Sequence, residues 1–257
     1  MGDLFESVLL GVVQGLTEFL PISSSGHLAL LQRLLGWEDA EANLDFTVVV
    51  HLGSLAAVTL FVGREIRAML TTQPRLLGLT AVATLPVVVV GLLAKSAVAS
   101  LSASPVAVGL ALLGTAALLA STRRLREGAR TNADLPLRNA FFVGVAQVLA
   151  LLPGLSRSGT TLTASLAAGL RRQVALRFSF LLAVPAIGGA GLLLLLEGGV
   201  QGGMPPGSLL AGGGASFLAS LVAMRVMVRV VEKRRLIWFA AYCAAVGAAA
   251  LVFGATR

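Results

Sequence analysis

Two apolar stretches of this sequence are broken in the same way, at Gln14-Gly-Leu-Thr-Glu-Phe-Leu-Pro-Ile-Ser-Ser-Ser-Gly-His27 and at Gln147-Val-Leu-Ala-Leu-Leu-Pro-Gly-Leu-Ser-Arg-Ser-Gly-Thr-Thr161. In each, a proline is followed by serine and then by Ser-Gly. Ionisable side chains and many hydroxyls thereby enter segments that otherwise have the composition of a membrane interior. Ionisable groups at that depth are costly and usually functional, and paired interruptions in two halves of a membrane protein point to a binding site.

The rest of the chain has the composition of a polytopic membrane protein. Of its 257 residues, 56% are hydrophobic and only 12% are charged, so we treat residues 1–257 as one membrane domain. The net charge of +8 lies in short loops between apolar runs, which is the positive-inside pattern and not a nucleic-acid-binding surface. The acidic N-terminus predicts no cleaved signal peptide. The single cysteine, Cys243, excludes an intrachain disulfide.

The spacing of the apolar runs predicts an all-α fold with six transmembrane helices. A span needs about 20 mostly apolar residues, and six segments qualify: 45–63, 76–95, 103–122, 176–196, 208–228 and 236–253. Two more apolar segments, 4–36 and 139–170, are broken at Pro21 to His27 and at Pro153 to Thr161, so neither half can cross alone. We predict two re-entrant helix–loop–helix hairpins, which exist only where protein or a cavity surrounds them.

The loop charges predict the side of the membrane on which each loop lies. Basic residues dominate four segments, which we expect in the cytoplasm: 64–75, 123–138, 171–177 and 225–235. Three segments carry acids or no charge and are expected outside: 38–45, 96–104 and 197–207. The first hairpin then enters from outside and the second from inside.

The two halves therefore read as one unit repeated with opposite topology. Corresponding span starts are shifted by 131 to 133 residues, and Ser25-Gly26 and Ser158-Gly159 by 133. We expect repeat 1 at residues 1–122 and repeat 2 at 123–257, with the hairpin tips meeting near the middle of the bilayer. The alternative of eight simple spans would place Glu18 and Arg157 in bare hydrocarbon and would break the charge pattern.

The hairpin tips have the chemistry of a phosphate or pyrophosphate site. We expect a new half-helix to begin near Leu28 and another near Thr160, and helix N-termini bind anions through free N–H groups and the helix dipole. Arg157 adds a guanidinium suited to phosphate. Hydroxyl donors are supplied by Ser23, Ser24, Ser25, Ser156, Ser158, Thr160 and Thr161; such serines also commonly cap helices.

Glu18 would repel a phosphate unless a cation lies between them. Mg²⁺ or Ca²⁺, held by a carboxylate and by substrate phosphates, would resolve this conflict, and Gln14 on the same helix face could add an amide oxygen. His27 is a candidate acid, base or nucleophile, and Ser24 is a candidate hydroxyl nucleophile. Purely structural roles for Glu18, His27 and Arg157 are the alternative. For His51, packing or cavity lining is favoured over catalysis.

Residues 14–27 and 153–161 resemble the two signature motifs of the bacterial undecaprenyl-diphosphatase family, membrane enzymes linked to bacitracin resistance. The resemblance covers nearly the whole chain. It implies hydrolysis of undecaprenyl diphosphate to the monophosphate and phosphate, in the bacterial inner membrane, which recycles the lipid carrier for peptidoglycan synthesis. By resemblance, Glu18 and Gln14 belong to the acidic motif that supports metal and diphosphate. His27 and Ser24 match the proposed catalytic pair, and Arg157, with Ser156 and Thr161 beside it, matches the diphosphate-binding arginine.

The family carries Glu or Gln at the position of Gln14, and this chain has the amide. A mechanism that needs two carboxylates in this motif is therefore less favoured, and Glu18 is the main charged ligand for a metal. We expect Ser24 or a water molecule to attack the terminal phosphorus while His27 handles the proton, with the site open to the outer face and the lipid tail between spans. A lipid-phosphate transporter with the same anion site is the main alternative. A structural scaffold would leave the buried ionisable groups unexplained. A homodimer is compatible with the sequence.

Overall fold

The computed structural model describes residues 4–37, 40–94, 101, 104–197 and 204–255. Within these ranges the fold is all-helical, and the sole β-type contact is an isolated bridge between Arg130 and Leu170. The described residues form eleven α-helices, in this order: α1 Leu4–Phe19, α2 Ser24–Leu34, α3 Ala40–Phe61, α4 Gly63–Thr71, α5 Pro74–Leu93, α7 Pro105–Ser121, α8 Leu137–Val148, α9 Arg157–Ala167, α10 Arg172–Glu197, α11 Pro206–Glu232 and α12 Ile237–Ala255.

Six of these helices are long and apolar enough to cross a membrane, which confirms the six predicted spans. The qualifying segments are Leu44–Phe61, Pro74–Leu93, Pro105–Arg124, Arg172–Leu196, Pro206–Glu232 and Ile237–Gly254. Their outer faces expose large apolar side chains, among them Leu93, Leu196 and Leu210, as expected of helices that contact lipid. One element was not predicted: the basic segment after the first span forms the short helix α4.

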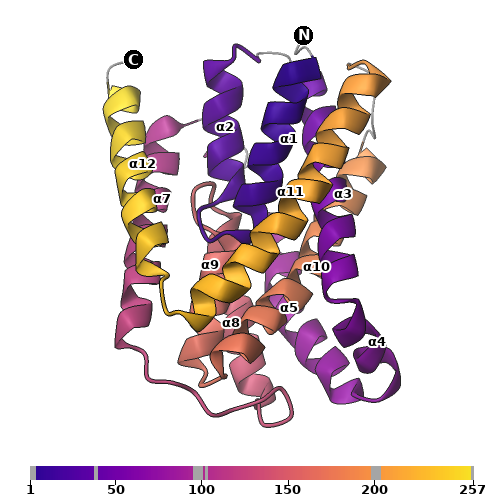
Figure 1. The fold of residues 1–257 in the computed structure, drawn as a ribbon, viewed down its shortest axis with the longest axis vertical. Coiled ribbons are helices and arrows are strands. Elements are labelled where there is room, and N and C mark those ends of the chain that lie inside the picture. The colour runs from indigo at the N-terminus through magenta and orange to yellow at the C-terminus, as the bar shows by residue number, and fades with distance from the viewer. Residues whose placement is uncertain (1–3, 38–39, 95–100, 102–103, 198–203, 256–257) are drawn as a thin grey trace.

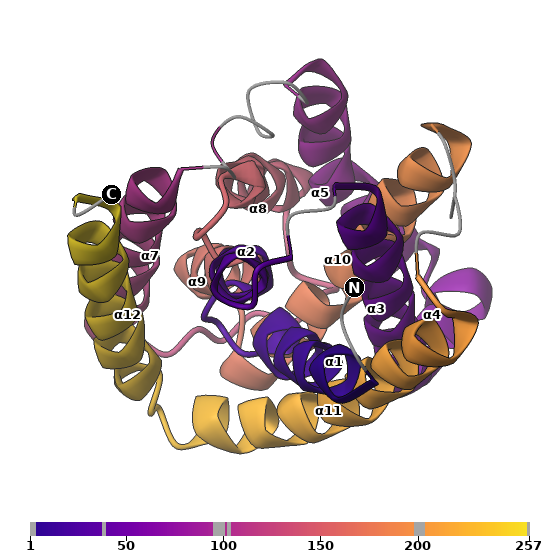
Figure 2. The same ribbon diagram turned by 90° about the horizontal axis from the view of Figure 1, so that it is seen from above.

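Four shorter helices, α1 with α2 and α8 with α9, form two pairs whose tips meet inside the molecule. Residues 20–23 join α1 to α2, and a 3₁₀ turn, Leu149–Leu151, followed by residues 152–156, joins α8 to α9. In Figure 1, α1 and α2 reach inward from the end that carries both termini, and α8 and α9 reach inward from the opposite end. Figure 2 shows α1, α2 and α9 enclosed by the longer helices.

The two hairpin tips touch. The backbone N–H of Gly154 donates to Oγ of Ser23 at 3.1 Å, and Oγ of Ser158 donates to the carbonyl oxygen of Leu20 at 3.1 Å. The sequence places the partners in each pair more than 130 residues apart. These bonds join the breaks in the two apolar stretches into a single polar centre.

Glycines let α1 lie directly against α11. A Cβ atom added at Gly11 would lie 2.2 Å from the carbonyl oxygen of Gly212, and one added at Gly15 would lie 2.3 Å from that of Ser216. Such close backbone approach is how membrane helices gain packing contacts without a hydrophobic driving force. The contact fixes α1, and with it the side chains near its C-terminal end.

Basic segments gather at the end of the molecule opposite the termini (Figure 1). Glu127 pairs with both Arg172 and Arg234, and Arg177 pairs with Glu65 at 2.8 Å. The four segments predicted to share one side of the membrane therefore share one end of the fold. Of the three segments predicted to lie on the other side, 96–104 and 197–207 fall largely outside the described residues, and 38–45 is described from Ala40 onward.

Gly11→Ala should destabilise the protein, because its methyl group must push α1 away from the α11 backbone. Overpacking of this kind costs about 1–3 kcal/mol, and we expect a lower thermal unfolding midpoint in detergent. Gly214→Ala is the control: it lies on α11, but an added Cβ meets no described atom within 4 Å. An equal midpoint for the two variants would contradict the close contact.

Candidate active site

Helices α2 and α9 each begin directly after a serine N-cap, a few residues earlier than we predicted from the sequence. Helix α2 begins at Ser24 and α9 at Arg157, not near Leu28 and Thr160. The physical reason is that Ser23 and Ser156 serve as N-caps: Oγ of Ser23 accepts from the N–H of Gly26, and Oγ of Ser156 accepts from that of Gly159. Ser23 adopts a positive φ of 70°, a conformation rare for residues other than glycine.

Glu18 is the centre of the polar contacts between the tips. Its side chain is buried, and its Oε1 lies 2.8 Å from Nη2 of Arg157, which comes from the other hairpin. Its Oε2 accepts hydrogen bonds from Oγ of Ser24 at 2.6 Å and from Nε2 of Gln14 at 3.0 Å. A buried carboxylate is tolerated only when it is paired and hydrogen-bonded in this way.

Arg157 keeps donors available for a ligand. Its Nη1 donates to the carbonyl oxygen of Ser179 at 3.3 Å, and its guanidinium lies 6.0 Å from the ring centroid of Phe19. With the bond to Glu18, two of about five guanidinium N–H donors have partners among the described residues. The other donors are of the kind that bind carboxylate or phosphate oxygens in pairs.

The remaining hydroxyls of the predicted anion site differ in their accessibility. Ser25 is exposed and Ser24 is half-buried. The four hydroxyls of the second tip are buried, and each has a partner: Ser156 shares a hydrogen bond with Ser158, which also donates to Leu20 of the first tip. Thr160 donates to the carbonyl oxygen of Ser156, and Thr161 bonds to the carbonyl oxygen of Arg157 and to the hydroxyl of Ser179 on α10. In this structure, those four residues shape the second tip, whereas Ser24 and Ser25 remain reachable.

His27 contacts α12 through the side chain of Tyr242. Its Nδ1 lies 2.8 Å from the carbonyl oxygen of Ser23, which can only accept, so Nδ1 carries the proton and Nε2 of the neutral ring is the acceptor. The hydroxyl of Tyr242 donates to Nε2 at 2.9 Å, and the two rings stack with centroids 5.6 Å apart. The described contacts include no hydrogen bond from His27 to Ser24, although both lie on α2, one turn apart.

Two residues join the predicted set on structural grounds. Nε2 of His51, on α3, lies 3.9 Å from Oε2 of Glu18, and its side chain is 27% exposed, so His51 lines the same polar centre. Tyr242 was not predicted. One feature of the sequence could have drawn attention to it: the single tyrosine of the chain lies inside an apolar span. However, nothing in the sequence relates Tyr242 to His27.

The residues around Glu18 supply some, but not all, of the oxygen ligands that a divalent cation needs. The described residues contain no group of three or more His, Cys, Asp or Glu side chains that could hold a metal ion. However, Oε1 of Gln14 is buried and has no hydrogen-bond partner there, so one amide oxygen and one carboxylate are available together. Mg²⁺ and Ca²⁺ take six or more oxygen ligands, and substrate phosphates commonly complete the set.

Comparison with known proteins places the chain among bacterial membrane proteins. Residues 7–249 match the family model described as bacitracin resistance protein BacA. An undecaprenyl-diphosphatase of Chromohalobacter salexigens is 43% identical, over 98% of this chain and 99% of the relative. Undecaprenyl-diphosphatases of Desulfatibacillum aliphaticivorans and Desulforapulum autotrophicum are 41% and 38% identical, over 96% and 98% of this chain and 97% and 99% of theirs.

Tyr242→Phe should change the hydrogen bonding of His27 alone. The variant keeps the stacked ring and removes only the hydroxyl that donates to Nε2. With ¹⁵N-labelled histidine, NMR should show the Nε2 signal of His27 move towards that of an unbonded ring nitrogen. The chain has two histidines, so the signals of His51 serve as the internal control. Unchanged His27 signals would show that the bond is absent in solution.

Proposed function

The chain belongs to the bacitracin resistance protein BacA family, and on this premise we propose that it is an undecaprenyl-diphosphatase. It would hydrolyse undecaprenyl diphosphate to undecaprenyl phosphate and phosphate, and so recycle the lipid carrier for peptidoglycan synthesis. One observation carries the proposal beyond family membership. Arg157 and Glu18, from different hairpins, meet beside the hydroxyl of Ser24 at the N-terminal ends of α2 and α9.

Binding of the diphosphate would use positive charge and N–H donors. The first N–H groups of α2 and α9 have no partner within their own helices, and helix N-termini attract phosphate. Arg157 would turn its unused N–H donors to the phosphate oxygens and keep its bond to Glu18. Preorganised groups of this kind supply most of the rate in phosphoryl transfer, since they stabilise charge that develops in the transition state.

The contact from Ser24 to Glu18 suggests how the attacking group is activated. In our mechanism, Oγ of Ser24 bonds to the terminal phosphorus while its proton passes to Glu18, its hydrogen-bond partner. The bond from this phosphorus to the bridging oxygen breaks, and its electrons leave on undecaprenyl phosphate. Water then hydrolyses the phosphoserine. Direct attack by a water molecule held by Glu18 is the alternative, and the same residues serve both routes.

We propose Gln14 and Glu18 as the protein ligands of a divalent cation, Mg²⁺ or Ca²⁺. The cation would neutralise phosphate charge that Glu18 otherwise repels. A carboxylate bound to a cation is a weaker base, so His27, one turn from Ser24 on α2, is then the remaining proton acceptor. His27 would have to exchange its bond with Tyr242 for this role.

We further propose that the two hairpins are re-entrant and that the halves 1–122 and 123–257 form an inverted repeat. In support, the hairpins reach inward from opposite ends, and both inner helices begin with a serine cap. By the charge rule, the end with the basic segments is cytoplasmic. The first hairpin then opens to the outer face of the inner membrane, which is the side proposed for substrate access.

A lipid-phosphate transporter with the same anion site is the rival proposal. Release of inorganic phosphate from undecaprenyl diphosphate by the purified protein in detergent separates the two, since a carrier needs two compartments and a hydrolase does not. We expect release in detergent. Lipid movement in vesicles without any phosphate release would favour the transporter.

Arg157→Lys should lower phosphate release on the order of tenfold or more, because a lysine keeps the charge but cannot grip two phosphate oxygens at once. Arg177→Lys is the matched control. Arg177 also pairs with a glutamate at 2.8 Å and lies 5.6 Å from a phenylalanine ring, but at the exposed basic end. If both variants turn over like the wild type, Arg157 does not clamp the diphosphate.

Exchanging amide and carboxylate at Gln14 and Glu18, one turn apart on α1, should affect activity differently at the two positions. Glu18→Gln should leave little activity, because it removes the one carboxylate of the motif. Gln14→Glu should be tolerated and should tighten binding of the cation, measured as the Mg²⁺ or Ca²⁺ concentration that restores activity after chelation. Full activity of Glu18→Gln in the presence of chelator would contradict both proposed roles of Glu18.

Single cysteines should report the proposed orientation. Gly207→Cys should react with a membrane-impermeant maleimide on intact spheroplasts, and Ala133→Cys only after permeabilisation. Both positions are exposed, and the native Cys243 is buried and should contribute little background. The reverse pattern would place the basic end outside and overturn the proposed direction of access.

A further inference from the structure

His51 places an imidazole nitrogen with a free lone pair beside Glu18. Its Nδ1 lies 2.7 Å from the carbonyl oxygen of Thr47, which can only accept, so Nδ1 carries the proton and Nε2 of the neutral ring does not. Nε2 lies 3.9 Å from Oε2 of Glu18, which is too long for a hydrogen bond. None of the hydrogen bonds among the described residues is donated to this nitrogen. Two electron-pair donors, one of them on a carboxylate, therefore lie side by side.

The separation of these two atoms suits a metal ion between them. Ligands that each lie about 2.0–2.2 Å from one ion are about 3–4 Å from one another. A histidine that binds a metal through one ring nitrogen usually donates the N–H of the other to a carbonyl or carboxylate, as His51 does to Thr47. A bridging water molecule would also satisfy the two acceptors, and metal binding distinguishes these two arrangements.

Gln14 adds a third atom to the set. Its Nε2 lies 3.0 Å from the same Oε2 of Glu18, and its Oε1 is buried without a hydrogen-bond partner among the described residues. A half-turn of the terminal amide exchanges these two atoms and brings Oε1 to about the separation expected of two ligands on one ion. Arg157 holds the other oxygen of Glu18 at 2.8 Å, so the ion would share Glu18 with the guanidinium without replacing it.

We propose that His51, Glu18 and Gln14 bind one divalent first-row transition-metal ion, through Nε2, Oε2 and Oε1. The proposal rests on the proposed hydrolase function and deepens it, because it adds a ligand to the cation site and names the class of ion. Mg²⁺ and Ca²⁺ take oxygen ligands, whereas an imidazole nitrogen favours transition metals. Three protein ligands leave positions for phosphate oxygens, and the His51 side chain is 27% exposed, so the ion is not sealed off from them.

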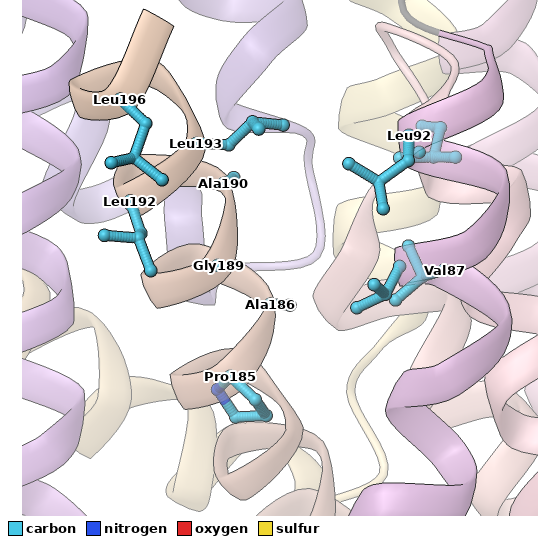
Figure 3. Close-up of a pocket in the computed structure, with 12 residues that line it drawn as sticks. Val87, Leu92, Pro185, Ala186, Gly189, Ala190, Leu192, Leu193 and Leu196 are labelled. Atoms are coloured by element: carbon cyan, nitrogen blue, oxygen red, sulfur yellow. The ribbon is translucent and has the colours of Figure 1, made fainter. Parts of the chain in front are cut away.

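Two other cavities of the described residues lack such a set. The pocket between α5 and α10, with a volume of about 300 Å³, is lined entirely by aliphatic side chains, glycine and proline, among them Val87, Leu92 and Pro185 (Figure 3). The cavity at the basic end, about 480 Å³, contains Glu127 and Glu232, but three arginines and no histidine line it with them. A histidine nitrogen bound to the ion therefore distinguishes the proposed site from adventitious binding at these places.

Electron paramagnetic resonance of bound Mn²⁺ tests the proposal on the purified protein in detergent, without substrate. The chain has two histidines, and ¹⁵N labelling of them changes the magnetic coupling between Mn²⁺ and any histidine nitrogen bound to it. We expect one coupled nitrogen and one Mn²⁺ per chain, with a lower Kd for Mn²⁺ than for Mg²⁺ or Ca²⁺. His51→Gln should abolish the coupling and raise the Kd for Mn²⁺ on the order of tenfold. The Kd for Mg²⁺ should change less, because an amide oxygen replaces the nitrogen.

His27→Gln is the matched control, since it makes the same exchange at the other histidine, whose Nε2 accepts from Tyr242. This variant should keep both the coupled nitrogen and the Kd for Mn²⁺. The proposal is overturned if the wild type binds no Mn²⁺, if it binds Mn²⁺ without a coupled nitrogen, or if His27→Gln removes the coupling. The wild type and His27→Gln decide the question even if His51→Gln does not fold.

Phosphate release from undecaprenyl diphosphate, measured on the same preparations, keeps this proposal separate from the hydrolase function. Coupled Mn²⁺ in a protein that releases no phosphate with Mn²⁺, Mg²⁺ or Ca²⁺ would refute the hydrolase function and retain the metal site. Phosphate release that persists in chelator, from a protein without coupled Mn²⁺, would retain the hydrolase function and refute the metal site.

Discussion

The ion pair between Glu18 and Arg157 is the interaction on which the polar centre depends. Each charge lies on a short helix that ends inside the protein; the side chain of Glu18 is 7% exposed and that of Arg157 is 14% exposed. Each charge stabilises the other, since an unpaired buried charge costs several kcal/mol or more. Together they hold the two hairpin tips in contact, and the caps at Ser23 and Ser156 set the helix ends around them. Loss of either partner would thus affect the arrangement of both tips as well as the chemistry.

This double role explains why polar residues are retained at such depth. A buried ion pair is a poor way to gain stability, because its desolvation offsets much of the attraction. At the proposed diphosphate site the same pair would be useful: the guanidinium would attract the substrate, while the carboxylate holds the guanidinium and accepts a hydrogen bond from Ser24. The close packing of α1 on α11, through Gly11 and Gly15, gives Glu18 a fixed position from which to do both.

Much of the architecture could be predicted from composition and spacing, and the six spans fell within a few residues of their predicted bounds. Apolar runs and loop charges are local signals, and they are strong in a membrane protein. The helix starts at Ser24 and Arg157 were placed too late, because a serine cap competes with the other roles that serine can have. The contact of His27 with Tyr242 was beyond prediction: it joins residues 215 positions apart, and its geometry depends on how α12 packs on α7. The roles of these side chains in turnover remain predictions.

Ser23 has a consequence for how the chain is assembled. Its Oγ accepts a hydrogen bond from Gly26 in its own helix and another from Gly154 in the second hairpin, while its backbone is held in the left-handed region. One of these two bonds, and the partner of Glu18, cannot form until the ribosome has made more than half of the protein. During synthesis Glu18 therefore lacks its ion-pair partner, and Ser23 lacks one of its two hydrogen bonds, until the second hairpin has been made. The second hairpin supplies both missing contacts when it is complete. We therefore expect that the amino-terminal half alone does not reach the conformation that it has in the full chain.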